Sequence, residues 1–236
     1  MKKIFISLTL LFASCGSEQE SSLDIVGGSP TYQSWYGRLE VARSFRCGSS
    51  LIAKRYAITA KHCIPSEDMR GRIKLKFGSY DSSDKENGGK PFDLVKVQKV
   101  FLHPKYDLAI LKLERPARFS PVRFSVGDVP DGAFVRAIGH GAVGWKKPTS
   151  DKLLTVKLIH VKDAGIYNRK DHLIYAGRSV GKDICHGDSG GPLIHNGALV
   201  GVAFWTGSQC GNYDSYKRPS AFTRPDIRWI NSIIDH

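Results

Sequence analysis

Hydrophobic and polar residues alternate along several short stretches of the chain, which is the period of a β-strand with one buried face. Residues 72–77 alternate strictly between the two classes. Stretches of similar length, punctuated by Gly, Pro, Asn and Asp, predict further strands at residues 94–101, 108–113, 134–138, 153–161 and 198–205. Many short strands with few helices favour an all-β protein built as a barrel or a sandwich.

One helix is expected near the end of the chain. Asp226 is a good candidate for its N-cap, because a short acidic side chain can accept a hydrogen bond from a free backbone N–H. The residues that follow repeat at helical spacing and place on one apolar face Ile227, Ile230, Ile233 and Ile234.

The chain has 236 residues, of which 41% are hydrophobic, so it can form one large domain or two fused small ones. Its formal net charge is +13, and a basic surface of this kind attracts anionic polymers and acidic proteins. Because the Lys and Arg residues are scattered rather than grouped, a solvated basic face is the favoured interpretation. No specific nucleic-acid partner is expected.

The first residues have the pattern of a secretory signal peptide, which we assign to residues 1–14. Lys2 and Lys3 precede an apolar run at residues 4–12, and small residues follow it. The apolar run is too short to cross a bilayer. The mature protein is therefore expected to be exported.

The end of this signal also resembles the bacterial lipoprotein signal, which is cut just before a cysteine that becomes lipidated. Cys15 is the candidate lipidation site, and the polar residues 15–24 are expected to form a linker or propeptide. We therefore expect a bacterial protein that is periplasmic, anchored to the outer membrane or extracellular. A plain signal cut nearby is the alternative, and it would leave Cys15 without a role.

The cysteine count fits export. An exported protein meets an oxidising compartment, so cysteines beyond the signal are expected to form disulfides. Setting Cys15 aside leaves four, namely Cys47, Cys63, Cys185 and Cys210. Four cysteines allow three pairings, and their spacing does not choose among them.

Three short segments carry candidate chemistry: residues 59–63 contain His62, residues 106–111 contain Asp107, and residues 187–192 contain Ser189. A serine hydroxyl is a poor nucleophile at neutral pH unless a histidine takes its proton and a carboxylate orients that histidine. The three segments supply these groups, and they indicate a hydrolase that works through an acyl-enzyme.

Together with the sequence Ile-Val-Gly-Gly at residues 25–28 and the segment at residues 182–192, these motifs resemble the trypsin-like (chymotrypsin-fold) serine proteases. The resemblance runs from Ile25 to about Ile234. It implies an all-β fold of two six-stranded antiparallel β-barrels packed together with the active site between them, and a short C-terminal helix. The protease domain would span residues 25–236, with halves at roughly 25–122 and 123–236.

The resemblance also implies roles for single residues. His62 would be the general base, Asp107 its orienting acid and Ser189 the nucleophile. The backbone N–H groups of Gly187 and Ser189 would form the oxyanion hole. The implied disulfides are Cys47–Cys63 and Cys185–Cys210. No cofactor is expected, and no metal ion, because the acids of the polar loop at residues 79–89 are best explained as solvated.

Members of this family are made as zymogens, and the resemblance implies activation by a cut before Ile25. The freed amino group would then pair with the buried carboxylate of Asp188. Here Leu23 and Asp24 stand before the cut, where the family usually has Arg or Lys. We therefore expect a different, activating protease as a partner, whose cut would also release the domain from a lipid anchor at Cys15.

Substrate choice is implied by Asp183, six residues before Ser189, which matches the acid at the floor of the pocket that selects Lys or Arg. An ordinary loop acid is the alternative. The pocket walls would include Trp205, Thr206 and Ser220. Thr206 and Ser220 stand where glycines are common, so the pocket is expected to be narrow. The substrates would be proteins or peptides.

Parts of the sequence are also compatible with two other functions. The sequence Gly-Asp-Ser-Gly-Gly at residues 187–191 also fits the nucleophile elbow of α/β-hydrolases, with Asp226 and His236 as nominal partners. That fold needs alternating strands and helices, which this chain lacks. The second alternative is a catalytically weak or inactive protease homologue that acts as a basic binding protein.

Overall fold

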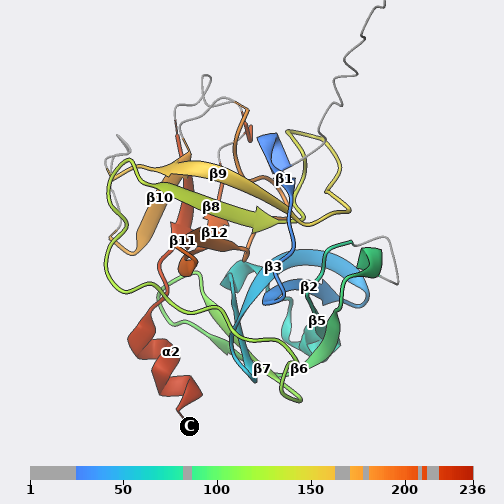
Figure 1. Ribbon diagram of the computed structural model, residues 1–236. Helices are drawn as coiled ribbons and strands as arrows, with labels where there is room; N and C mark the ends of the chain where they lie inside the picture. Colours follow the sequence, from blue (N-terminus) through green and yellow to red (C-terminus); the bar gives the residue numbers. More distant parts are fainter. Residues whose placement is uncertain are drawn as a thin grey trace, which may run out of the picture.

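The computed structural model describes residues 25–81, 87–162, 171–177, 181–206, 209–211 and 218–235. The expected signal and linker, with Cys15, lie outside these residues. The described chain forms two antiparallel β-barrels and a C-terminal helix (Figure 1). The all-β, two-barrel fold is therefore confirmed.

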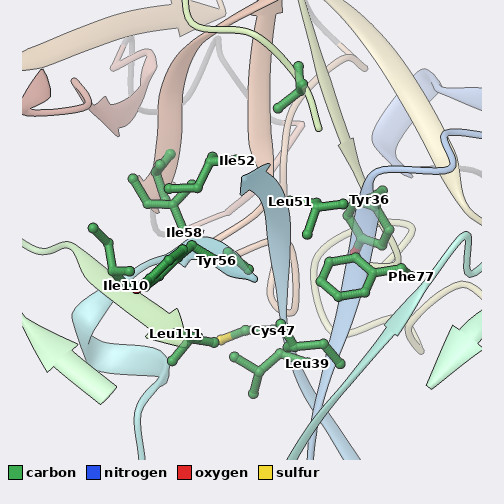
Figure 2. Packing of buried hydrophobic residues seen from close by; sticks show 14 of the residues in the cluster. Tyr36, Leu39, Cys47, Leu51, Ile52, Tyr56, Ile58, Phe77, Ile110 and Leu111 are labelled. Carbon is green, nitrogen blue, oxygen red and sulfur yellow. The ribbon is translucent and has the colours of Figure 1, made fainter. Parts of the chain in front are cut away.

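Six strands close the first barrel in the order β2–β3–β4–β7–β6–β5. Their bounds are Tyr36–Val41 (β2), Ser44–Ala53 (β3), Tyr56–Thr59 (β4), Ile73–Phe77 (β5), Asp93–Leu102 (β6) and Ala109–Leu113 (β7). Alternate side chains fill its interior, and Figure 2 shows Leu39, Phe77 and Ile110 among them. All three are fully buried.

The second barrel follows the order β8–β9–β10–β13–β12–β11, and pairing of β8 with both β9 and β11 closes it. The short strand β1 (Ser29–Pro30) adds to β9 at its edge. The barrel strands are Phe134–Gly139 (β8), Leu154–His160 (β9), Leu173–Gly177 (β10), Pro192–His195 (β11), Ala198–Trp205 (β12) and Ser220–Thr223 (β13).

The C-terminal helix α2 spans Ile227–Ile234, as the sequence predicts. The Asp226 side chain caps it by accepting a hydrogen bond from the Trp229 N–H. Ile230 is fully buried against the first barrel. Ile233 and Ile234 also pack against this barrel, whereas Ile227, at the start of the helix, is 41% exposed.

Short 3₁₀ turns link the strands at Ile25–Gly27 (η1), Lys61–Cys63 (η2), Glu67–Arg72 (η3) and Asn87–Gly89 (η4). No helix in the described ranges is long and apolar enough to cross a membrane. The turn η2 carries His62, one of the candidate site residues.

Candidate active site

His62 and Asp107 meet at one end of the first barrel. Strands β4 and β7 pair with Thr59 opposite Ala109, so the residues just beyond this pair lie side by side. His62 Nδ1 lies 2.6 Å from Asp107 Oδ2, and the His62 backbone N–H donates to Asp107 Oδ1 at 2.9 Å. These two bonds fix both the position and the orientation of the imidazole. The ring is 43% exposed, so its outer edge can meet a substrate.

A disulfide between Cys47 and Cys63 ties the His62 turn to strand β3. Both sulfurs are fully used by this bond. Although Cys47, Cys63 and His62 place ligand atoms within 4.8 Å of one another, the disulfide leaves no thiolate to bind a metal ion.

Ser189 lies on the loop that precedes β11, and this loop crosses between the barrels. The Gly48 N–H donates to the Ser189 carbonyl at 2.8 Å. Next to it, Gly190 has φ +75° and sits so close to Thr59 that a Cβ would overlap the threonine hydroxyl. The loop therefore rests against the strand that leads to His62. Among the described residues no hydrogen bond joins Ser189 Oγ to His62.

Two backbone N–H groups beside Ser189 are available to a ligand. In the described part of the chain, the N–H groups of Asp188, Gly190 and Gly191 donate to carbonyl oxygens, whereas those of Gly187 and Ser189 donate to none. Gly187 has φ +96°, and a Cβ there would press on Gly141 and on neighbouring side chains. A glycine is thus needed at this position, as an oxyanion hole requires.

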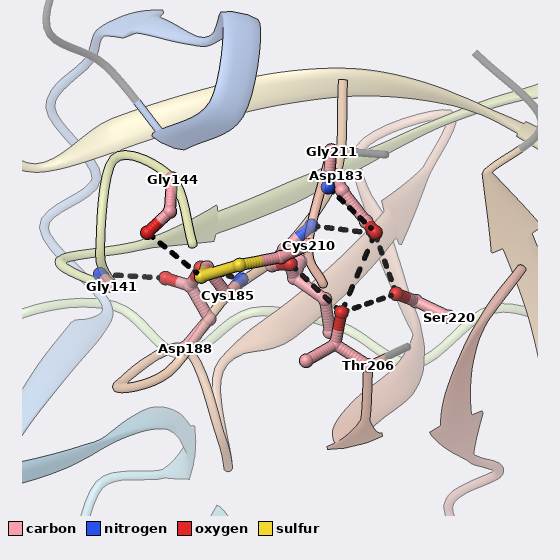
Figure 3. Close-up of a disulfide and its surroundings, with 10 residues drawn as sticks. Gly141, Gly144, Asp183, Cys185, Asp188, Thr206, Cys210, Gly211 and Ser220 are labelled. Atoms are coloured by element: carbon pink, nitrogen blue, oxygen red, sulfur yellow. Dashed lines mark hydrogen bonds between the residues drawn. A yellow bond between two sulfur atoms is a disulfide. The ribbon is translucent and has the colours of Figure 1, made fainter. Parts of the chain in front are cut away.

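Asp188 is buried in the loop that precedes Ser189. Its carboxylate accepts hydrogen bonds from the backbone N–H groups of Gly141 and Cys185, both at 2.8 Å (Figure 3). A Cβ on Gly139 or Gly141 would overlap this carboxylate. Burial raises the pKa of Asp188 to about 7, and the nearby charge of Asp183 adds to the rise, although the two N–H donors oppose it.

The segment around Ile25 packs on the second barrel and contacts Asp183 and the disulfide of Cys185 and Cys210. Ile25 is fully buried in the core of the second barrel. The Val26 carbonyl accepts from the Asp183 N–H at 3.2 Å, and Val26 packs against the disulfide formed by Cys185 and Cys210. The beginning of the domain therefore contacts both Asp183 and the loop that holds the nucleophile.

Asp183 is surrounded by hydroxyl groups (Figure 3). Ser220 Oγ donates to its Oδ1 at 2.5 Å, and Thr206 Oγ1 lies 3.4 Å from its Oδ2. Burial raises the pKa of Asp183, while hydrogen bonds from Ser220, Gly211, Ile184 and Thr206 act in the opposite direction. The carboxylate is thus already partly satisfied by the protein.

A cavity of about 280 Å³ opens beside Ser189, and the residues around it include His186, Trp145, Phe204, Trp205 and Thr206. Its described lining contains Thr206 but neither Asp183 nor Ser220. Thr206 therefore stands between the cavity and the acid. Trp145, which is 38% exposed, was missed by the sequence reasoning, because no motif marks it. Residues 207 and 208, which follow Thr206 in the chain, lie outside the described residues.

The polar loop at residues 79–89 is organised by an amide. Asn87 is fully buried; its Oδ1 accepts from the N–H groups of Tyr80 and Asp81, and its Nδ2 donates to the carbonyls of Gly78 and Lys90. These four bonds satisfy two N–H groups and two carbonyls in the described parts of the loop and beside it. Residues 82–86 lie outside the described ranges.

Two antiparallel barrels, with a His–Asp pair on one and a serine loop on the other, define a serine protease of the chymotrypsin fold. The family model described as "Trypsin" matches residues 25–230. The chain belongs to the trypsin family, and its enzymatic class is serine endopeptidase.

Known proteins agree with this assignment. The chain is 30% identical to trypsin 5G1 of Aedes aegypti, over 87% of this chain and 89% of the relative. It is 28% identical to the chymase of Mus musculus, over 97% of this chain and 98% of the relative. The solved structure of mouse neuropsin, a serine protease, has a TM-score of 0.77 at 22% identity, covering 89% of this chain and 99% of neuropsin.

Proposed function

We propose that the chain is a secreted serine endopeptidase that is made as a zymogen and cleaves peptide bonds through an acyl-enzyme. The observation that carries the proposal is the doubly bonded pair of His62 and Asp107, which faces a serine loop with a cavity beside it. Ser189 is the nucleophile, His62 the base and Asp107 the residue that orients His62.

In the proposed reaction His62 Nε2 takes the Ser189 hydroxyl proton as Oγ bonds to the substrate carbonyl carbon. Negative charge moves to the carbonyl oxygen, where the N–H groups of Gly187 and Ser189 stabilise it. His62 then gives its proton to the leaving amine, and an acyl-enzyme remains. Water, activated in the same way, releases the second product.

Cleavage after Lys or Arg is the proposed specificity. Asp183 supplies a buried carboxylate whose pKa is raised by burial, against the opposing effect of its hydrogen bonds. A substrate ammonium or guanidinium group would supply a cation to pair with it. The Thr206 and Ser220 hydroxyls narrow the route to Asp183 and already hydrogen-bond its carboxylate before a substrate binds. We therefore expect cleavage to be selective for basic residues but reduced in rate.

The zymogen proposal rests on Asp188. In the uncleaved chain the Ile25 nitrogen is part of a peptide bond to Asp24 and carries no charge. The buried Asp188 carboxylate then has only backbone N–H partners in the described structure. A cut before Ile25 creates an ammonium group within the same buried region. Because Asp24 precedes the cut, a protease of different specificity performs it.

The proposed location follows from the sequence alone. The signal and Cys15 suggest an exported bacterial protein, held at a membrane by a lipid until the activating cut releases it. The relatives named above come from an insect and a rodent, so they support export of the family but not a bacterial source. A radiolabelled fatty acid that fails to reach the wild-type chain, when it labels a known lipoprotein in the same cells, would refute the lipid anchor.

A catalytically weak homologue with a binding role is the second candidate, favoured by the hydroxyl-filled surroundings of Asp183. The deciding experiment is a cleavage profile on a mixed peptide library, with protein processed to begin at Ile25. We expect cuts after Lys and Arg that disappear in the Ser189→Ala variant. Cuts that persist in this variant, or none from the processed wild type, would contradict the proposed function.

A further inference from the structure

We propose that His103 is a positioning residue, which holds the loop of Asp107 in the orientation that His62 requires. The inference rests on the proposed function of Asp107. It concerns a histidine that is only 3% exposed, lies outside the His62–Asp107–Ser189 set and sits four residues before Asp107 in the chain.

The loop from His103 to Leu108 is folded around the His103 imidazole. The His103 backbone N–H donates to the Leu108 carbonyl at 2.9 Å and closes the loop. Inside it, His103 Nδ1 accepts from the N–H groups of Lys105 and Tyr106, at 3.1 Å and 2.9 Å. One ring nitrogen thus satisfies two backbone donors of a loop that is too short to bond itself fully.

The other ring nitrogen anchors the loop to the C-terminal helix. His103 Nε2 lies 3.2 Å from Asp226 Oδ2. Because Nδ1 accepts two hydrogen bonds, the ring proton must be on Nε2, which donates to the carboxylate. Asp226 also caps α2 through Trp229. Partial burial acts to raise the pKa of Asp226, but these hydrogen bonds outweigh it and leave the pKa below its usual value.

Aromatic rings fix the residue next to Asp107. Tyr106 stacks on His103 with ring centres 4.7 Å apart, and on its other face it stacks on His172 at 4.4 Å. Trp229 meets the His103 ring edge-on at 4.6 Å. A side chain held between two rings cannot rotate freely, so the backbone leading into Asp107 is fixed as well.

The same histidine also contacts the turn that carries the base. Lys61 Nζ donates to the His103 carbonyl at 3.1 Å, and Lys61 directly precedes His62. The charged groups that face His103 are therefore Asp226 and Lys61, with His172 beyond the Tyr106 ring. His103 thus contacts Lys61, the neighbour of His62, and Tyr106, the neighbour of Asp107. A buried histidine with a purely structural role would not require both contacts.

The test compares two substitutions in the processed enzyme. His103→Phe keeps a flat ring for stacking but has no acceptor and no donor. His103→Asn keeps an acceptor close to the position of Nδ1. We expect His103→Phe to lower kcat on the order of 100-fold with KM nearly unchanged, because small misplacements of catalytic groups have effects of this size. His103→Asn should recover at least part of that loss, and the acid limb of the pH–rate profile should move only in His103→Phe.

A second readout does not need activity. The proton shared by His62 Nδ1 and Asp107 should give a downfield ¹H NMR signal, which His103→Phe should shift or abolish. The matched control is His160→Phe, because His160 is also buried, lies in the second barrel, and among the described residues its ring bonds to the Pro130 carbonyl. An unchanged signal in His103→Phe, or a kcat loss equal to that of His160→Phe, would overturn the inference. Wild-type protein that gives the signal but has no turnover would instead contradict the proposed function.

Discussion

The two barrels contribute to the site in different ways. On the first barrel, His62 and Asp107 are joined by two hydrogen bonds and braced by a disulfide. On the second barrel, Asp183 and Asp188 are carboxylates with raised pKa values and no cation beside them in the described structure. The acid of the first barrel is paired with His62, whereas the two carboxylates of the second barrel have no positive charge beside them in the described structure.

This difference indicates where control resides. The His–Asp pair is held by groups that are already in place in the first barrel. A buried carboxylate without a counter-charge is unfavourable, and supplying the charge stabilises one particular arrangement of the loop around it. In the proposed function, the second barrel is the half that would respond to processing at Ile25 and to a basic substrate.

The largest expected effect tests whether the residues of the two barrels depend on each other in catalysis. Ser189→Ala and His62→Ala should each lower kcat by about 10⁶-fold, and the double variant should lose no more than either single variant. Turnover numbers with a peptide ester measure this. Additive losses would show that the two barrels contribute independently.

Asp107→Asn tests the first barrel alone. The amide preserves the shape of the side chain but cannot stabilise a charged imidazole or hold its tautomer, so kcat should fall by about 10⁴-fold. Stopped-flow acylation rates measure the loss. Asn231→Asp, on the exposed side of helix α2, is a matched surface control and should leave the rate unchanged.

Asp188→Asn tests the second barrel in the processed enzyme. Losing the buried pair with the new amino group should weaken the active loop arrangement by about 3–5 kcal/mol. The result should be a fall of kcat/KM on the order of 10²–10³-fold. An Asp188→Asn enzyme with wild-type kcat/KM would show that the Ile25 amino group does not act through this acid.

In the uncleaved chain, the burial of Asp188 should make the free energy of unfolding depend on pH. Its folded pKa of about 7 exceeds the usual 3.8, so the folded state holds this proton more tightly than the unfolded state does. The free energy of unfolding should therefore decrease by a few kcal/mol as pH rises from about 4 to about 7. Urea unfolding at several pH values measures this decrease, and Asp188→Asn should flatten it.

The smallest expected effect concerns the pocket. Ser220→Gly removes the hydroxyl that donates to Asp183 Oδ1 at 2.5 Å and leaves that oxygen with the Ile184 N–H as its partner, so it can accept a further hydrogen bond from the substrate. We expect kcat/KM for an Arg ester to rise about tenfold, as one charge-assisted hydrogen bond is worth about that much. Esters of apolar residues should show no gain, and an equal gain for both would contradict a role for Asp183.

Much of the fold could be predicted from the sequence. Strand Asp93–Leu102 has one exposed face and shows an alternating pattern, and Ile73–Phe77 alternates in sequence although most of it is buried. No strand was predicted at the positions of β1, β2, β3, β4, β10, β11 and β13. Of these, β4, β10 and β13 are short and buried along their whole length. Buried on both faces, they have no period of two to detect.

The site was only partly predictable. The segments around His62, Asp107 and Ser189 are contiguous motifs, so the resemblance found them directly. The His103 loop and Trp145 depend on residues brought together from distant parts of the chain, and no local pattern records such contacts. The hydroxyl groups around Asp183 were expected as bulk in the pocket, but their hydrogen bonds to the acid required coordinates.

The most direct test measures how fast a fluorophosphonate labels Ser189 before and after residues 1–24 are removed at an engineered cleavage site. The account predicts slow labelling of the uncleaved chain and labelling on the order of 100-fold faster or more once Ile25 is the N-terminus, with none in Ser189→Ala. Equal rates in the two forms, or no labelling of the processed form, would contradict it.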